Sequence, residues 1–319
     1  MSVAADVVVD LNGVTKEFDK VTAVDDLTCS VNRGDVLGLL GHNGAGKTTT
    51  LRLISGVLTP TCGTVTAFGM DPVDRGDEVR RRTGVMLARP PVDRRMTGRE
   101  NLEFTARLYG VERRLARDRL EELVVSFHLD DRLDDLVEHY SDGMVQRLAL
   151  ARMLLPDPTL LLLDEPTAAL DPMAAYGVRQ LIADLAGAQE RTIIISTHDL
   201  IEAAQVCDRV AVLQRGELVA LGSPQELAGS VAARGLQLVV SELDRMAASG
   251  LALEHGYTVE PLADGEMRVH GVGYERVPEL VHALVEADID LYGVTIDQPT
   301  LTDFYLALHQ DDDGPTDGM

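Results

Sequence analysis

A glycine-rich loop, Gly41-His-Asn-Gly-Ala-Gly-Lys47-Thr48, constrains the fold of this chain more than any other feature. It follows the apolar run 36–40, which is typical of a buried strand, and it precedes a helical pattern that ends near Gly56. Backbone N–H groups of such a loop turn toward a polyphosphate, and the positive end of the helix dipole adds to the attraction. The order strand, loop, helix therefore predicts a phosphate-binding loop, with Lys47 on the β- and γ-phosphates and the Thr48 hydroxyl on Mg²⁺.

Further apolar runs predict a central sheet around this loop. Each run is continuous in apolar character, as expected of a strand covered on both faces. The runs are residues 36–40, 83–87, 160–163, 192–196 and 209–214. Because these runs alternate with longer helical patterns, they predict an α/β layer fold. The charged sequence between residues 71 and 155 has a helical pattern and predicts an inserted helical subdomain.

Two adjacent carboxylates, Asp164 and Glu165, end the run 160–163. Side chains alternate along a strand, so the two carboxylates are expected to point in different directions and to take different roles. In-line attack on a γ-phosphate needs such a division, with one group at the metal and the other at the attacking water. Taken alone, a strand that ends in Asp-Glu is equally consistent with an ordinary solvated strand end.

The charge of the chain excludes several classes of function. Acidic residues number 52 against 29 basic ones, and the formal charge is −23. General binding to nucleic acid or anionic lipid is therefore not expected unless a local basic patch exists. No apolar stretch approaches the roughly 18–20 residues of a membrane helix, so we expect a cytosolic chain. The three cysteines, Cys29, Cys62 and Cys207, lack metal or disulfide spacing and are interpreted as small core residues.

A separate domain is predicted to begin near residue 229. Residues 231–319 hold four arginines, no lysine and 17 acidic residues. The predicted elements are strands at 236–241, 257–262, 266–271 and 290–296 and helices at 243–253, 275–287 and 300–309. The βαββαβ order of the first six predicts a ferredoxin-like α+β module. The acidic end, 311–319, is expected to be disordered.

Together the loop and the two carboxylates resemble the nucleotide-binding subunit of an ABC transporter, and the resemblance covers roughly residues 7–228. Tyr140-Ser-Asp-Gly-Met144 is similar to the signature motif of that family, and His198 looks like its switch histidine. The resemblance implies a P-loop NTPase of the ABC ATPase type in residues 1–228, followed by the accessory domain 229–310. It also implies an ATPase that binds ATP and Mg²⁺.

The resemblance further implies a role for individual residues. Those that bind the nucleotide are Phe18, Gly41, His42, Asn43, Gly44, Ala45, Gly46, Lys47, Thr48 and Thr49, with Ser141, Asp142, Gly143 and Met144 serving ATP held by a partner subunit. Thr48 and Asp164 would hold Mg²⁺, while Glu165 would polarise the attacking water and His198 would steady the γ-phosphate. A half-buried strand Phe is the competing interpretation of Phe18.

Two positions depart from the family pattern. Ala88 stands where a Gln that contacts Mg²⁺ and water is usual, and alanine can do neither. Asp142 stands in the signature motif where Gly is frequent. A carboxylate at that position is favoured by the helix dipole and can point to solvent.

The implied partners are a separately encoded membrane permease and a second copy of the chain or a paralogous ATPase subunit, at the cytoplasmic face of the membrane and without nucleic acid. The segment 297–308 resembles the drug-resistance and polymer-export branch, of the daunorubicin-resistance type. The alternatives are a soluble ABC ATPase without a permease, for example in iron–sulfur cluster assembly, and an importer ATPase with a regulatory C-terminal domain. The excess of Asp over Lys supports the hypothesis of a halophilic host, against ordinary negative charge for solubility.

Overall fold

The structure, a computed structural model, describes residues 6–168, 170–188, 191–231, 235–262, 266–297 and 299–310. The chain divides into two compact units between Pro224 and Gln225, and each unit is described by itself. The boundary predicted from the sequence lies four residues further along the chain. The predicted acidic tail, 311–319, lies outside the described residues.

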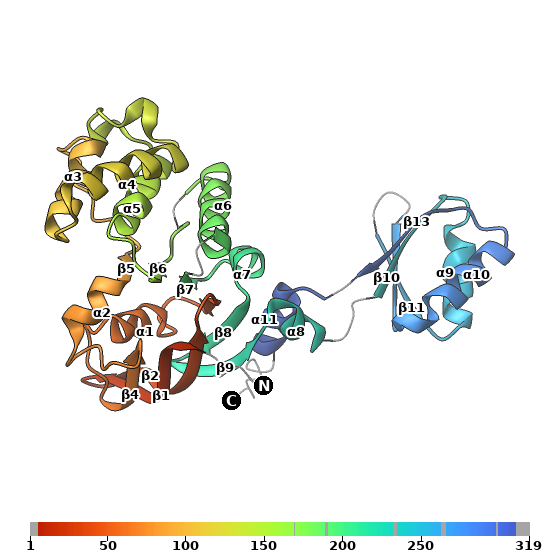
Figure 1. Ribbon diagram of the computed structural model, residues 1–319. Coiled ribbons are helices and arrows are strands. Elements are labelled where there is room, and N and C mark those ends of the chain that lie inside the picture. Colours follow the sequence, from red (N-terminus) through yellow and green to blue (C-terminus); the bar gives the residue numbers. More distant parts are fainter. Residues whose placement is uncertain are drawn as a thin grey trace. The chain divides into compact units, whose positions relative to one another are not determined.

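A six-stranded sheet forms the centre of the first unit, in the order β5-β6-β7-β3-β8-β9 (Figure 1). All neighbours are parallel except β8 and β9, which pair antiparallel. The strands are β3 (Val36–Leu40), β5 (Thr83–Met86), β6 (Leu160–Asp164), β7 (Thr192–Thr197), β8 (Arg209–Gln214) and β9 (Glu217–Gly222). The five apolar runs of the sequence are thus all strands of one sheet. Every residue of β3, β6 and β7 is buried, as their continuous apolar character predicts.

Helix α1 (Lys47–Ile54) packs against β6 and β7 and also against a second, antiparallel sheet. That sheet has the order β2-β1-β4, built from β1 (Val7–Phe18), β2 (Val21–Asn32) and β4 (Cys62–Ala67). Its buried residues share one apolar cluster with β3, β6 and α1. The phosphate-binding loop is therefore anchored on both sides by strands.

The cysteine prediction is correct for two residues and wrong for one. Cys29 and Cys207 are buried, and a Cβ added at Gly38 in β3 would lie 2.7 Å from Cys207 Sγ. Cys62, in contrast, is exposed. The physical reason is its place in the sheet, because Cys62 is the first residue of β4 and β4 is an edge strand.

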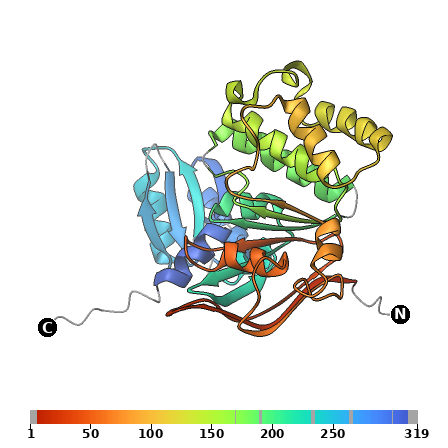
Figure 2. The ribbon, with the colours of Figure 1, turned by 90° about the vertical axis from the view of Figure 1, so that its left-hand side faces the viewer.

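A group of helices lies to one side of the central sheet in the first unit (Figure 2). It contains α3 (Gly98–Leu108), α4 (Arg113–Ser126), α5 (Asp142–Leu154) and the short 3-10 helices η1 (Asp130–Arg132) and η2 (Val137–His139). Thr97 starts α3 with a capping box, in which Glu100 N donates to Thr97 Oγ1 and Thr97 N donates to Glu100 Oε2. The range 71–155 predicted for this subdomain also includes α2 (Gly76–Arg82) and β5, although β5 belongs to the central sheet.

The remaining helices of the first unit are α6 (Pro172–Ala188) and α7 (Leu200–Val206). Helix α7 packs against β3 and β7, while α6 packs against α5 and α7. Helix α6 therefore connects the helical group to the helix that follows His198.

The second unit has the predicted βαββαβ order, with an antiparallel sheet in the order β11-β12-β10-β13. Its elements are α8 (Pro224–Gly229), β10 (Gly235–Val240), α9 (Arg245–Glu254), β11 (Thr258–Pro261), β12 (Glu266–His270), η3 (Tyr274–Arg276), α10 (Val277–Glu286), β13 (Leu291–Asp297) and α11 (Leu301–Gln310). Strands β10 and β12 and helices α9 and α10 supply most of its apolar core. Among the described residues of both units, no helix is long and apolar enough to cross a lipid bilayer.

Candidate active site

The glycine-rich loop joins β3 to α1 and has the backbone that its glycines allow. Gly44 and Gly46 have φ of 89° and 103°, in the left-handed region where residues with a Cβ are strained. A Cβ at Gly46 would also lie 2.5 Å from the carbonyl oxygen of Ala23 in β2. Helix α1 begins at Lys47 without a side-chain cap, so the positive end of its dipole faces the loop.

Within this loop, residues 42–44 are exposed and residues 45–47 are buried. The Lys47 side chain is only 4% exposed, and its Nζ donates to the carbonyl oxygens of Gly41 at 2.6 Å and His42 at 3.1 Å. Nζ also lies 3.5 Å from Glu165 Oε1. The ammonium group is therefore held at the loop itself, where a phosphate would replace the carbonyl contacts.

Asp164, at the end of β6, faces α1. Thr48 Oγ1 lies 3.0 Å from Asp164 Oδ1 and 3.1 Å from its Oδ2, and Ser196 Oγ donates to Oδ1 at 2.5 Å. Thr48 and Asp164, the two residues expected from the sequence to hold Mg²⁺, thus lie within hydrogen-bonding distance of each other. A hydroxyl and a carboxylate beside a phosphate loop are the hard oxygen donors that Mg²⁺ prefers, so these residues fit that ion.

Glu165 points the other way, as the alternation along the strand predicts. Its φ is 48°, and its amide donates to the carbonyl oxygen of Ser196 at 3.0 Å and to Ser196 Oγ at 3.2 Å. Its Oε2 lies 3.1 Å from Nδ1 of His198, whose side chain is 55% exposed. One carboxylate therefore contacts both the lysine of the loop and the histidine after β7.

A cavity of about 160 Å³ lies beside this pair of side chains. Its lining residues are Glu165, Thr167, Ala168, Thr197, His198 and Asp199. A polar cavity of this size at a carboxylate is suited to a water molecule that the carboxylate polarises.

Phe18 lies at the tip of the hairpin between β1 and β2 and is 43% exposed. Lys16 Nζ lies 5.1 Å from the centroid of its ring. The hairpin leads directly to Ala23, whose carbonyl approaches Gly46 of the loop. The exposed ring therefore lies on the strand pair that borders the loop, which is compatible with stacking on a base.

The signature motif lies at the start of α5, a helix that packs against α3, α4, α6 and β5. Ser141 caps the helix, and its Oγ accepts from Met144 N at 3.3 Å. The Asp142 side chain is 79% exposed and lies 3.8 Å from Arg94, so it points to solvent. Gly143 is buried, and a Cβ there would lie 3.0 Å from the Cβ of Ala174 in α6. Within the residues that the structure describes, no hydrogen bond or ion pair joins this motif to Lys47, Asp164 or Glu165.

Two side chains that support the site were missed by the sequence analysis. Ser196 holds both Asp164 and the amide of Glu165, and its only sequence signal is the end of the Ile-rich run of β7. Gln146 is buried in α5 and donates from Nε2 to the carbonyl oxygen of Pro166, which ties the signature helix to the loop behind Glu165. A polar residue inside an apolar helix was the signal available for it.

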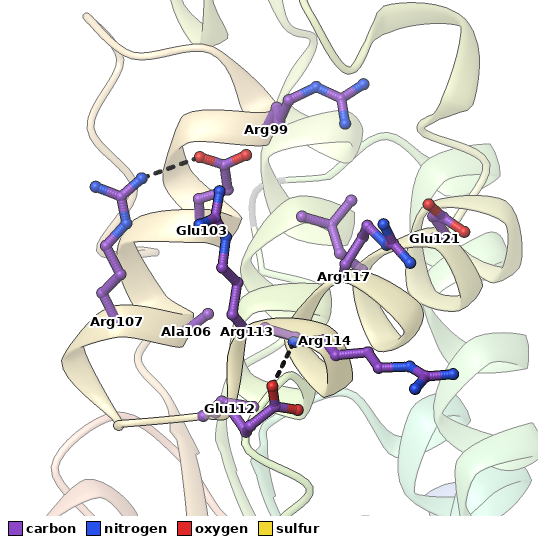
Figure 3. A pocket seen from close by; sticks show the side chains of 12 residues that line it. Arg99, Glu103, Ala106, Arg107, Glu112, Arg113, Arg114, Arg117 and Glu121 are labelled. Atoms are coloured by element: carbon purple, nitrogen blue, oxygen red, sulfur yellow. Dashed lines mark hydrogen bonds and ion pairs between the residues drawn. The ribbon is translucent and has the colours of Figure 1, made fainter.

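A second cavity, of about 1070 Å³, lies between α3 and α4 and carries a local basic patch (Figure 3). Its lining includes five arginines and three glutamates, namely Arg99, Arg107, Arg113, Arg114, Arg117, Glu103, Glu112 and Glu121. Arg99 forms two hydrogen bonds with Asp134 and Arg107 pairs with Glu103, whereas no ion pair within the described residues uses Arg113 or Arg114. The net negative charge of the whole chain does not predict this basic groove.

Fold and site together define a P-loop ATPase of the ATP-binding cassette type. A family model described as "ABC transporter" matches residues 24–168. The chain is 35% identical to the daunorubicin resistance ATP-binding protein DrrA3 of Streptomyces coeruleorubidus, over 97% of this chain and 98% of that protein. It is 33% identical to the bacitracin transport ATP-binding protein BcrA of Bacillus licheniformis, over 94% and 97%.

Solved structures agree with the fold of the first unit. The structure of an ATP-binding subunit of an ABC transporter is 29% identical, with a TM-score of 0.63, and the match covers 69% of this chain and 91% of that one. An ATP-binding cassette solved as a dimer with ADP and phosphate is 25% identical, with a TM-score of 0.61, covering 67% and 98%. The chain belongs to the ATP-binding subunits of ABC transporters, and it is an ATPase whose hydrolysis is coupled to transport.

Proposed function

We propose that two copies of this chain close around two ATP molecules and that the closure drives a separate permease in export. The observation that carries the hydrolytic part of the proposal is the position of Glu165, which contacts the loop lysine through Oε1 and His198 through Oε2. A carboxylate at that position can accept a proton from a water that attacks the γ-phosphate.

Each residue of the site has a part in this proposal. Lys47 exchanges its bonds to the loop carbonyls for bonds to the β- and γ-phosphates, and the loop amides hold the remaining phosphate oxygens. His198 donates to the γ-phosphate and keeps Glu165 oriented. Phe18 stacks on the base. The proposal assigns Mg²⁺ to Thr48 and Asp164, and the ion, when bound, neutralises charge on the phosphates.

The signature motif serves the ATP of the other copy. The free start of α5, with the exposed Ser141 as its cap, is an anion site of the kind that a helix N-terminus provides. Gln146, on the same helix, contacts the loop that follows Glu165. A signature helix that binds the partner's γ-phosphate is thus mechanically linked to the hydrolytic site of its own chain.

Export is favoured over the alternatives by the extent of the similarity. Relatives named for daunorubicin resistance and bacitracin transport match more than nine-tenths of the chain, including the second unit. Because the chain acts on a membrane permease, we place it at the cytoplasmic face of the membrane.

The face formed by α3 and α4 is the part of the chain that we assign to contact with the permease. Phe104 and Leu108, neighbours on one face of α3, are 52% and 68% exposed, and Arg113 and Arg114 line the adjacent groove. Exposed apolar side chains next to arginines are typical of protein interfaces.

The substitution Glu165→Gln tests the central proposal. It should leave ATP binding intact and slow hydrolysis by about 10²- to 10⁴-fold, the range for loss of a general base. The variant should also accumulate as an ATP-bound dimer in size-exclusion chromatography. Glu286→Gln, an exposed glutamate of the second unit, is the matched control. Hydrolysis by Glu165→Gln at nearly the unmodified rate would overturn the assignment.

A further inference from the structure

Glu202, in α7, is a fully buried carboxyl group that the proposed mechanism does not use. Its residue is 0% exposed, and Oε1 accepts from Thr167 Oγ1 at 2.9 Å. The other oxygen, Oε2, is buried and has no hydrogen-bond partner within the part of the chain that the structure describes. Burial of a carboxyl group with an unsatisfied oxygen is unfavourable, so packing alone does not explain its presence.

The groups around Glu202 come from several elements. Asp199 caps α7 by accepting from the amides of Ile201 at 2.8 Å and Glu202 at 3.3 Å. Arg179 of α6 lies 3.9 Å from Asp199, and its Nε is also buried without a partner in the described chain. Burial raises the pKa of the Glu202 carboxyl, and the hydroxyls of Thr197 and Thr167 partly oppose that rise.

These contacts close a ring that includes the two catalytic side chains. Thr167 follows Glu165 by two residues, and Glu202 follows His198 by four. Glu165 contacts His198 at 3.1 Å, and Thr167 contacts Glu202 at 2.9 Å, so the segment that follows β6 and the segment that follows β7 are joined twice. The cavity of about 160 Å³ lies beside both contacts.

We infer that Glu202 is a positioning residue that fixes the loop of Glu165 against helix α7, which follows His198, and so keeps the Glu165 and His198 side chains aligned for attack on the γ-phosphate. The inference rests on the proposed function, in which Glu165 polarises water and His198 contacts phosphate. The contact that matters is the hydrogen bond that the Thr167 hydroxyl donates to Glu202 Oε1. This bond requires an acceptor oxygen at residue 202 but not a negative charge.

Removal of the hydroxyl at Thr167 is the first test, because this residue is only partly buried and the variant should fold. Thr167→Val should lower kcat about 10- to 100-fold with KM for ATP nearly unchanged, since small displacements of catalytic groups have effects of this size. Thr167→Ser keeps the hydroxyl and should restore the rate. Thr83→Val is the matched control, because the buried Thr83 hydroxyl donates to Val79 in an element outside the ring.

Substitution of Glu202 supplies the second test. Glu202→Gln retains an acceptor oxygen and should keep kcat within about threefold, whereas Glu202→Ala should reproduce the loss seen in Thr167→Val. The double variant, Glu202→Ala with Thr167→Val, should be no slower than either single variant, because both remove the same contact.

The outcomes separate this inference from the proposed function. If Thr167→Val and Thr83→Val have equal kcat, or if the losses at Thr167 and Glu202 multiply, the inference is overturned. If Glu202→Gln is as slow as Glu202→Ala, the charge matters and not the acceptor bond, which also overturns it. Failure of the proposed function would be seen in a different variant, because Glu165→Gln would then hydrolyse ATP at the normal rate.

Discussion

The two units of the chain differ in what they bury. Every buried polar or charged side chain of the described residues lies in the first unit, from Lys47 to Glu202. In the described part of the second unit, the buried side chains are all hydrophobic. The first unit therefore contains most of the unfavourable burial, whereas in the described part of the second unit only the Nε atom of Arg245 is buried without a hydrogen-bond partner.

The difference in buried side chains indicates a different role for each unit. Burial of Lys47, Asp164 and Glu202 costs free energy that only hydrogen bonds and ion pairs return, and those bonds are the ones that shape the ATP site. The second unit has a core of the ordinary apolar kind, which stabilises a fold without requiring any ligand. We expect substitutions to affect activity in the first unit and stability in the second.

The largest expected effect is on the stability of the second unit. Leu238, in β10, is 0% exposed, and Leu238→Ala should lower the free energy of unfolding of that unit by about 2–5 kcal/mol. ATP binding by the first unit should not change. Thermal unfolding and a nucleotide-binding titration on the same full-length variant measure both quantities. A weakened affinity for ATP would mean that the two units are not independent in the way that their cores indicate.

A second experiment compares the units by their charge. Residues 231–319 hold 17 acidic residues and four arginines, so repulsion is concentrated there. At about 1 M salt the Debye length is only about 3 Å, and screening should raise the melting temperature of the second unit more than that of the first. Melting curves at about 0.1 M and about 2 M KCl test this. An unchanged or lower melting temperature at high salt would remove the support for the halophile hypothesis.

The smallest effect is expected at Ala88, an exposed residue just after β5. Ala88→Gln restores the side chain that the family uses and should raise turnover by about two- to tenfold, since one hydrogen bond contributes about 0.5–1.5 kcal/mol. Steady-state ATPase rates at several Mg²⁺ concentrations measure the change. If the rates match those of the unmodified chain, either Arg89 already makes the contact or the loop lies elsewhere than proposed.

Local patterns made the phosphate loop predictable. The strand, loop and helix around Lys47 are consecutive in sequence, and so are Asp164 and Glu165 at the end of β6. The contacts of Ser196 and Glu202 cross more than 30 residues and depend on the order of strands in the sheet, which no local pattern contains. Cys62 was predicted wrongly for the same reason, because an edge strand and a central strand can have similar sequences.

The basic groove could not be predicted from the net charge, which is summed over the whole chain. A formal charge of −23 does not reveal a local basic patch, whereas α3, α4 and the turn between them bring five arginines and three glutamates to one cavity. Two of these arginines lie on α3 and three on α4, so the contact between the two helices brings the five together. The packing of α3 beside α4 therefore gives this acidic chain a local basic groove.

The three cysteines differ in burial, and this difference allows one of them to be labelled selectively. Cys29 and Cys207 are buried, and burial raises the pKa of both thiols, so neither is readily converted to the reactive thiolate. Cys62 is exposed at the edge of the antiparallel sheet. A maleimide dye should therefore attach at Cys62 alone without any engineering. Energy transfer between dyes on two copies would then follow the closing and opening of the pair during each turnover in real time.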